Sequence, residues 1–213
     1  MKKQRSDYRP VFPVALLIGL CGVAYADGVN VLGDASFEQG SGGEWTLFEI
    51  SMMSRNHARS GESSMYNGGF SRSVPHPPYF IGNASGAFQE FPAAPGSTWR
   101  LTGFGLTPAP LEGAPAFGIL QVTFFDASGQ DLGTVETGGT DTKAKVSAEI
   151  NARSAVGQWI ALDTGVATAP QGTASVQAFT LYVDYSGKGL SQGVYFDDLA
   201  LCEVSNDSES CGE

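Results

Sequence analysis

The sequence predicts an all-β sandwich, and three observations support this fold class. Apolar and polar residues alternate over short runs, and clusters of Gly, Pro, Ser and Asp separate the runs. No long segment has the i, i+3, i+4, i+7 spacing of an amphipathic helix. Short strands at regular spacing, with turn residues between them, are typical of a sandwich.

The first 26 residues are predicted to be a signal peptide. Four basic residues precede position 10, residues 11–23 are apolar, and Ala24-Tyr25-Ala26 has the small residues that a signal peptidase recognises. The apolar run is shorter than the ~20 residues that span a bilayer, which disfavours a membrane anchor. We therefore expect cleavage before Asp27 and a secreted or periplasmic protein that does not insert into the membrane.

The mature chain is small and acidic. Residues 1–26 hold four of the 12 basic and one of the 22 acidic residues, so 8 basic and 21 acidic residues remain, a net charge of about −13. This charge disfavours nucleic acid as a partner, because a phosphate backbone would be repelled. The remaining length suits one domain, residues 27–204, followed by an acidic tail, residues 205–213.

Two cysteines, Cys202 and Cys211, remain after cleavage. In an oxidising compartment such a pair predicts one disulfide, which would tie the acidic tail to the last strand. Metal binding by the pair is the weaker alternative, because only two histidines accompany it.

The predicted strands follow one another along the whole chain. Residues 30–38 and 194–201 are strand-like segments at opposite ends, which favours a sandwich whose two ends meet. The strands expected in order are 44–52, 63–66, 86–91, 99–107, 116–125, 158–162, 174–185 and 193–204. Residues 143–155 have some helical propensity but lack a clear apolar face.

Turn residues support these boundaries. Pro95-Gly96 precedes the strand that begins at position 99, and Pro170-Gln171-Gly172 introduces the strand that begins at position 174. Residues 126–130, Asp-Ala-Ser-Gly-Gln, are typical of a hairpin loop in which Gly takes a positive φ.

Period-two alternation assigns strand residues to the two faces of each sheet. It places Leu120, Val122 and Phe124 toward the core, and likewise Phe179, Leu181 and Val183. The opposite faces combine aromatic with polar side chains, which suits sugar rings. The candidate ligand-binding residues are Arg100, Phe104, Gln121, Thr123, Tyr182 and Asp184, with Tyr79 of the Pro-rich loop 70–82 as a covering aromatic residue. An ordinary outer sheet face has the same mixture, so the alternation alone leaves both readings open.

The two ends of the domain resemble one known family. Residues 30–38, Asn-Val-Leu-Gly-Asp-Ala-Ser-Phe-Glu, resemble its motif N-[VL]-L-G-[ND]-x-S-F-E, and residues 194–201, Val-Tyr-Phe-Asp-Asp-Leu-Ala-Leu, resemble V-Y-F-D-D-[LV]-x-L. The family is the bacterial carbohydrate-binding module of the cellulose- and xylan-binding jelly-roll type, families four, nine and twenty-two of the galactose-binding-like superfamily. The resemblance covers nearly all of residues 30–202, and it includes residues 95–104, 122–129 and 169–176.

The resemblance implies a jelly-roll β-sandwich, a polysaccharide or oligosaccharide ligand on its concave sheet face, and a structural calcium. The calcium ligands it implies are Glu38, backbone carbonyls of Gly61 and Ser64, and Asp198. Oxygen ligands of this kind suit a hard cation. Solvated surface carboxylates are the alternative, because the sequence contains no contiguous calcium loop.

The function favoured by the sequence is a secreted, monomeric, non-catalytic glycan-binding module. Known motifs for nucleophilic, zinc or phosphate chemistry do not occur, and the two histidines lack ligand spacing. A small polysaccharide hydrolase or lyase on the same sandwich remains open, because a catalytic carboxylate pair has no fixed sequence spacing. A structural or adhesive surface protein is the third alternative.

Overall fold

The computed structural model describes residues 28–40, 43–69, 84–112, 116–137, 144–185, 192–205 and 211. All elements named in it are strands, as the sequence predicts. They are β1 (Thr46–Phe48), β2 (Ser51–Ser54), β3 (Ser64–Gly68), β4 (Ala84–Pro92), β5 (Thr98–Leu106), β6 (Ala116–Asp126), β7 (Asp131–Gly133), β8 (Lys145–Val146), β9 (Ile160–Thr168), β10 (Thr173–Asp184) and β11 (Gly193–Glu203).

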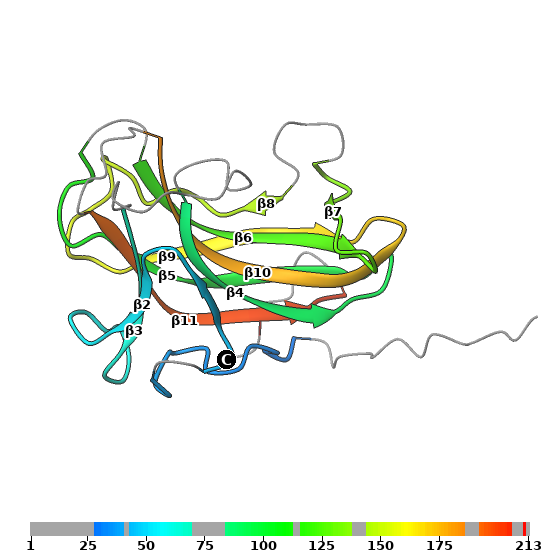
Figure 1. The fold of residues 1–213 in the computed structure, drawn as a ribbon, viewed down its shortest axis with the longest axis horizontal. Coiled ribbons are helices and arrows are strands. Elements are labelled where there is room, and N and C mark those ends of the chain that lie inside the picture. Colours follow the sequence, from blue (N-terminus) through cyan, green and yellow to red (C-terminus); the bar gives the residue numbers. More distant parts are fainter. Residues whose placement is uncertain are drawn as a thin grey trace, which may run out of the picture.

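The strands form two antiparallel sheets packed face to face (Figure 1). Sheet A has six strands, in the order β1-β4-β10-β6-β7 with β8 also paired to β6, and sheet B has five, in the order β2-β3-β11-β5-β9. Most neighbours in each sheet come from distant parts of the chain, which is the topology of a jelly-roll sandwich. The predicted fold class is confirmed.

The core lies between the two sheets. Trp99 and Leu101 of β5, Val122 and Phe124 of β6, and Leu201 of β11 all belong to it, each with 0% exposure. The period-two assignment of Leu120, Val122 and Phe124 in β6 is therefore correct. Burial of these side chains supplies the main driving force for folding, because apolar area leaves water.

Each of the eight strands expected from residue 44 onward overlaps a strand of the structure, which has eleven strands among its described residues. The run 44–52 divides into β1 and β2, which belong to different sheets, and Glu49 between them has a positive φ of 55°. The run 158–162 is really the longer β9. The helical tendency of residues 143–155 does not lead to a helix: of residues 144–155, which the structure describes, 145–146 form β8.

Residues 30–38 do not form a strand, so that prediction was wrong. Asp34 and Phe37 have positive φ angles of 45° and 60°, and the Asp34 carboxylate accepts the Glu38 N–H at 2.7 Å, which bends the segment into turns. The ends of the domain nevertheless meet. The N–H of Val31 donates to Leu201 O at 2.9 Å, and the N-terminal segment runs along β11 (Figure 1).

Cys202 and Cys211 lie at disulfide distance, with their Cα atoms 5.5 Å apart, as predicted. The pair ties Cys211 of the tail to the outer face of sheet B, where Val166 and Ala200 pack against it. The described part of the chain contains no helix long and apolar enough to cross a membrane.

Candidate functional site

The outer face of sheet A carries a row of three phenylalanines, which we call the aromatic row: Phe48 of β1, Phe88 of β4 and Phe179 of β10. The ring centroids of Phe48 and Phe88 are 6.5 Å apart, and those of Phe88 and Phe179 are 5.3 Å apart. All three side chains are half-buried, so part of each ring is open to solvent. The row crosses three neighbouring strands.

The strand register brings the row together. Phe179 stands directly opposite Phe88, and Phe48 stands opposite Gly86 on the same strand as Phe88. Opposed residues in an antiparallel pair project to the same face, so their side chains meet. A second apolar cluster, with Ile119, Leu181 and Val183 as its buried members, supports the row on this face and is separate from the main core.

Polar groups accompany the aromatic row. Gln177 Nε2 donates to Glu90 Oε2 at 3.0 Å across β10 and β4, and Gln121 of β6 stands opposite Phe179. Thr123, further along β6, donates its hydroxyl to Asp131 at 2.7 Å. Aromatic rings pack against the C–H face of a sugar, and amides and a carboxylate beside them can bind its hydroxyls. Such a combination of groups is typical of a saccharide-binding site.

The sequence assigned the two faces of β10 the wrong way round. Tyr182 has 0% exposure and Asp184 has 1%, and both point between the sheets. Phe179, Leu181 and Val183, which alternation placed in the core, lie on the outer face of sheet A. The outward set of β10 is the more apolar one, because it forms the aromatic surface, whereas the inward set includes Thr180 and Asp184. The alternation therefore gives the period of the strand but not the direction in which it faces.

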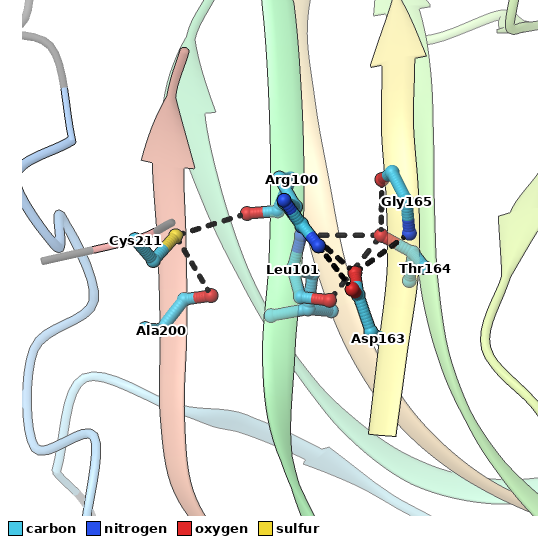
Figure 2. Close-up of polar contacts among 7 residues, drawn as sticks. All are labelled: Arg100, Leu101, Asp163, Thr164, Gly165, Ala200 and Cys211. Carbon is cyan, nitrogen blue, oxygen red and sulfur yellow. Dashed lines mark hydrogen bonds and ion pairs between the residues drawn. The ribbon is translucent and has the colours of Figure 1, made fainter. Parts of the chain in front are cut away.

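Arg100 and Phe104 do not join the other candidates, because they lie on the outer face of sheet B. The Arg100 Nε donates to Asp163 at 3.0 Å, and a second N–H of the guanidinium completes a paired contact (Figure 2). This pairing lowers the pKa of Asp163 below its usual range. The guanidinium carbon of Arg59 lies 3.5 Å from the Phe104 ring centroid. The predicted single surface is therefore wrong.

Gln121 and Thr123 face outward on sheet A, as predicted, although Thr123 is nearly covered at 2% exposure. Their role toward a ligand stays a prediction. Tyr79 lies outside the described residues.

The residues predicted as calcium ligands gather around one turn, residues 59–63. The Glu38 carboxylate accepts the N–H groups of Glu62 at 3.0 Å and Ser63 at 2.9 Å, and the Asp198 carboxylate binds the side chains of Arg59 and Ser60. Among the described residues, no three His, Cys, Asp or Glu side chains are placed to share a metal. A calcium ion would have to compete with Arg59 for Asp198, and calcium binding stays a prediction.

Asp197 holds the same turn against β11. Its carboxylate has no exposed surface and accepts the N–H groups of Arg59 at 2.7 Å, Ser60 at 3.3 Å and Asp198 at 2.8 Å. Burial raises the pKa of Asp197 to about 6, because the charged form loses its hydration. Three backbone donors partly offset this cost, and the carboxylate positions the loop rather than a ligand.

Comparison with known protein families and with curated protein sequences gives no match. Solved structures do match. The CBM22-1 xylan-binding domain of Paenibacillus barcinonensis Xyn10C is 14% identical with a TM-score of 0.53, and the match covers 86% of this chain and 99% of that one. The C-terminal family 22 carbohydrate-binding module of Clostridium thermocellum Xyn10B is 16% identical with a TM-score of 0.52, covering 85% and 98%.

The chain has the jelly-roll fold of these carbohydrate-binding modules. A part of a larger protein matches as well: the enzymatically active domain of tailspike protein 4 from bacteriophage CBA120, at 14% identity and a TM-score of 0.50. That match covers 83% of this chain and only 22% of the tailspike chain. At these identities the likeness establishes the fold.

Within this jelly roll, sequence reasoning missed all three residues of the aromatic row. Phe88 lies in a run, residues 84–92, in which three inward positions are the small or polar Ser85, Ala87 and Gln89 and the fourth is Phe91. In the middle of that run Phe88 is the largest apolar side chain, and the small Ala87 and the polar Gln89 flank it. The one available signal was an aromatic residue in the middle of a strand whose alternate positions are small or polar residues.

Proposed function

We propose that this protein is a secreted, non-catalytic glycan-binding module that holds a polysaccharide on the outer face of sheet A. The aromatic row is the single observation that carries the proposal. A line of three half-buried rings on an outer sheet face, spaced 5.3 and 6.5 Å apart, offers stacking surfaces for successive sugar units.

The side chains beside the row supply hydroxyl recognition. Gln121 and the Gln177–Glu90 pair offer both donors and acceptors, as sugar hydroxyls require. We expect modest affinity, because a row of three rings contacts only a few sugar units. The xylan-binding domain named above has the same fold, which makes xylan oligosaccharides the first ligands to test.

Two further properties belong to the proposal. The signal-like residues 1–26 direct the protein to the periplasm or the medium, and the acidic composition of the mature chain suits that destination. A structural calcium, held near Glu38 and Asp198, stabilises the contact between the N-terminal segment and the last strand without taking part in sugar binding.

Calorimetry on Phe179→Ala tests the proposal, with Phe104→Ala as the matched control. Both positions are half-buried phenylalanines on outer sheet faces, but they lie on opposite sheets. We expect Phe179→Ala to weaken binding about 5–30-fold, the equivalent of about 1–2 kcal/mol for one stacking contact, while Phe104→Ala leaves the dissociation constant unchanged. Thermal melts of both variants confirm that each remains folded.

The ligand panel consists of soluble xylan, β-glucan, galactan, agar and alginate oligosaccharides. Reducing ends and unsaturated products are measured in the same samples. Product formation would establish an enzyme. Equal weakening by both variants, or no binding to any ligand of the panel, would contradict a binding site on sheet A.

A further inference from the structure

The outer face of sheet B carries a second aromatic cluster, on the side of the sandwich opposite the aromatic row. Tyr66 of β3 and Tyr195 of β11 stand opposite each other in register, with ring centroids 4.9 Å apart. His57 packs its edge against Tyr195 at 4.7 Å. A hollow of about 230 Å³ opens over the two tyrosines, and its walls come from the loop after β5 and from the start of β11. Its lining residues are Tyr66, Pro108, Ala109, Leu111, Gln192, Gly193 and Tyr195.

Two glycines set the position of the Tyr66 ring. Gly68 and Gly193 face each other across β3 and β11 on the same outer face. A Cβ atom on Gly68 would lie 2.7 Å from Tyr66 Cε1, and one on Gly193 would lie 2.5 Å from Tyr66 Cε2. No side chain fits at Gly68 or Gly193, so the Tyr66 ring packs directly against the backbone of these two glycines. The ring surface that the glycines leave uncovered borders the hollow.

Polar groups of the hollow are held in place by bonds outside it. Gln192 Oε1 accepts the N–H of Glu112 at 2.9 Å, which orients the amide and leaves its NH₂ group as a donor. The Thr107 hydroxyl donates to Ala109 O at 2.6 Å and fixes the facing loop. Burial, together with Tyr195, raises the pKa of Tyr66, so its phenol remains a protonated donor at neutral pH.

The size and charge of the hollow restrict its ligand. Sites for drug-sized ligands measure about 300–1,000 Å³, so a hollow of about 230 Å³ has room for one ring. None of the described residues that line it is charged, which disfavours an anion. One aromatic surface, apolar walls at Leu111 and Pro108, and amide and phenol donors together suit a neutral pyranose.

We infer that this hollow, the Tyr66 pocket, is a second carbohydrate site that takes a single neutral sugar ring, on the sheet face opposite the aromatic row. The two sites are independent of each other, because they lie on different sheets. A glycan end held here and a glycan chain held on sheet A would let one module contact two chains.

Backbone and side-chain amide NMR on the full mature protein tests the inference. The probes are the methyl β-glycosides of xylose, glucose and galactose, with glucuronate as the charged comparison. We expect a neutral glycoside to shift the signals of Gly193 and of the Gln192 side-chain amide, with millimolar affinity, and glucuronate to leave them unmoved.

Variants separate the pocket from the aromatic row. Gln192→Ala should weaken glycoside binding at least five-fold, and Tyr66→Phe, which retains the ring, should weaken it about two- to five-fold. Gln130→Ala, an exposed glutamine in the β6–β7 hairpin, is the matched control and should have no effect. Phe179→Ala should also leave this affinity unchanged.

Three results would overturn the inference: no shift at Gly193 with any neutral glycoside at 50 mM, a stronger response to glucuronate, or unaltered affinity in both Gln192→Ala and Tyr66→Phe. If Gln192→Ala fails to fold, the wild-type shifts and Tyr66→Phe decide the question. A loss of oligosaccharide binding in Phe179→Ala alone tests the proposed site on sheet A and does not bear on the Tyr66 pocket.

Discussion

Replacing Tyr182 by Phe is expected to stabilise the protein. Tyr182 is fully buried in the core of the sandwich, and its hydroxyl has no hydrogen-bond partner among the described residues. An unsatisfied buried polar group costs about 1–3 kcal/mol. Phe retains the ring and its packing while removing the hydroxyl, so we expect a gain of about 1 kcal/mol, or about 2–4 °C in Tm for a domain of this size.

The pH dependence gives a second readout of the same substitution. Burial raises the pKa of Tyr182 well above its usual value, with further contributions from Asp184 and Tyr66. The folded state therefore holds the proton more tightly than the unfolded state. The resulting stability is complete below about pH 10 and is lost as the pH rises beyond it. Tyr182→Phe lacks this loss, so its advantage over the wild type should grow in alkaline solution.

Urea unfolding followed by circular dichroism, at pH 7 and pH 10.5, measures both effects. Tyr182→Ala serves as the comparison and should lose about 3–5 kcal/mol, as expected for removing a core aromatic ring. Neither variant should change sugar binding beyond its effect on folding. A loss of 1 kcal/mol or more in Tyr182→Phe would refute the reasoning, because it would mean that the hydroxyl is bonded, for example through a buried water.

Three other predictions concern the calcium, the disulfide and the ion pair between Asp163 and Arg100. EDTA should lower the Tm of the wild type but not of Asp198→Ala. A wild-type Tm unaffected by EDTA would contradict a structural calcium. Non-reduced mass spectrometry should find no free thiol at Cys202 or Cys211, and reduction should cost at most about 2–3 kcal/mol, the entropy of so short a loop. Asp163→Asn should cost less than about 1 kcal/mol at pH 7, because its pair with Arg100 is partly exposed. Since the folded pKa of Asp163 is lowered, this difference should disappear as the pH falls below about 4.

Local sequence patterns gave the correct orientation for β6. In β6, Leu120, Val122 and Phe124 point into the core as their alternation predicts. The disulfide pair and the hairpin loop at residues 126–130 also follow from local signals, since Gly129 adopts a φ of 82° and the Asp126 side chain accepts the N–H of Ser128. Such features depend on residues that are close together in the chain.

The wrong orientation of β10 has a physical cause. β10 has apolar residues on both faces, and its inward set, which includes Thr180, Tyr182 and Asp184, is more polar than its outward set. An apolar binding face on the outside of a sheet looks in sequence like a core face, so alternation gives the period of the strand but not its direction. Tyr182 and Asp184, chosen on this basis, consequently lie in the interior. Arg100 and Phe104 face outward, but they belong to the other sheet.

The sequence by itself determined the fold class, the approximate places of most strands, the joining of the two ends and the cysteine pair, because hydrophobic period and turn chemistry are local. Only the tertiary structure decided which strands are neighbours and which way each strand faces. Phe48, Phe88 and Phe179 are separated by tens of residues and become a row only through the pairing of β1, β4 and β10. Strand pairing is settled by the packing of whole sheets against each other, and no single segment contains that information.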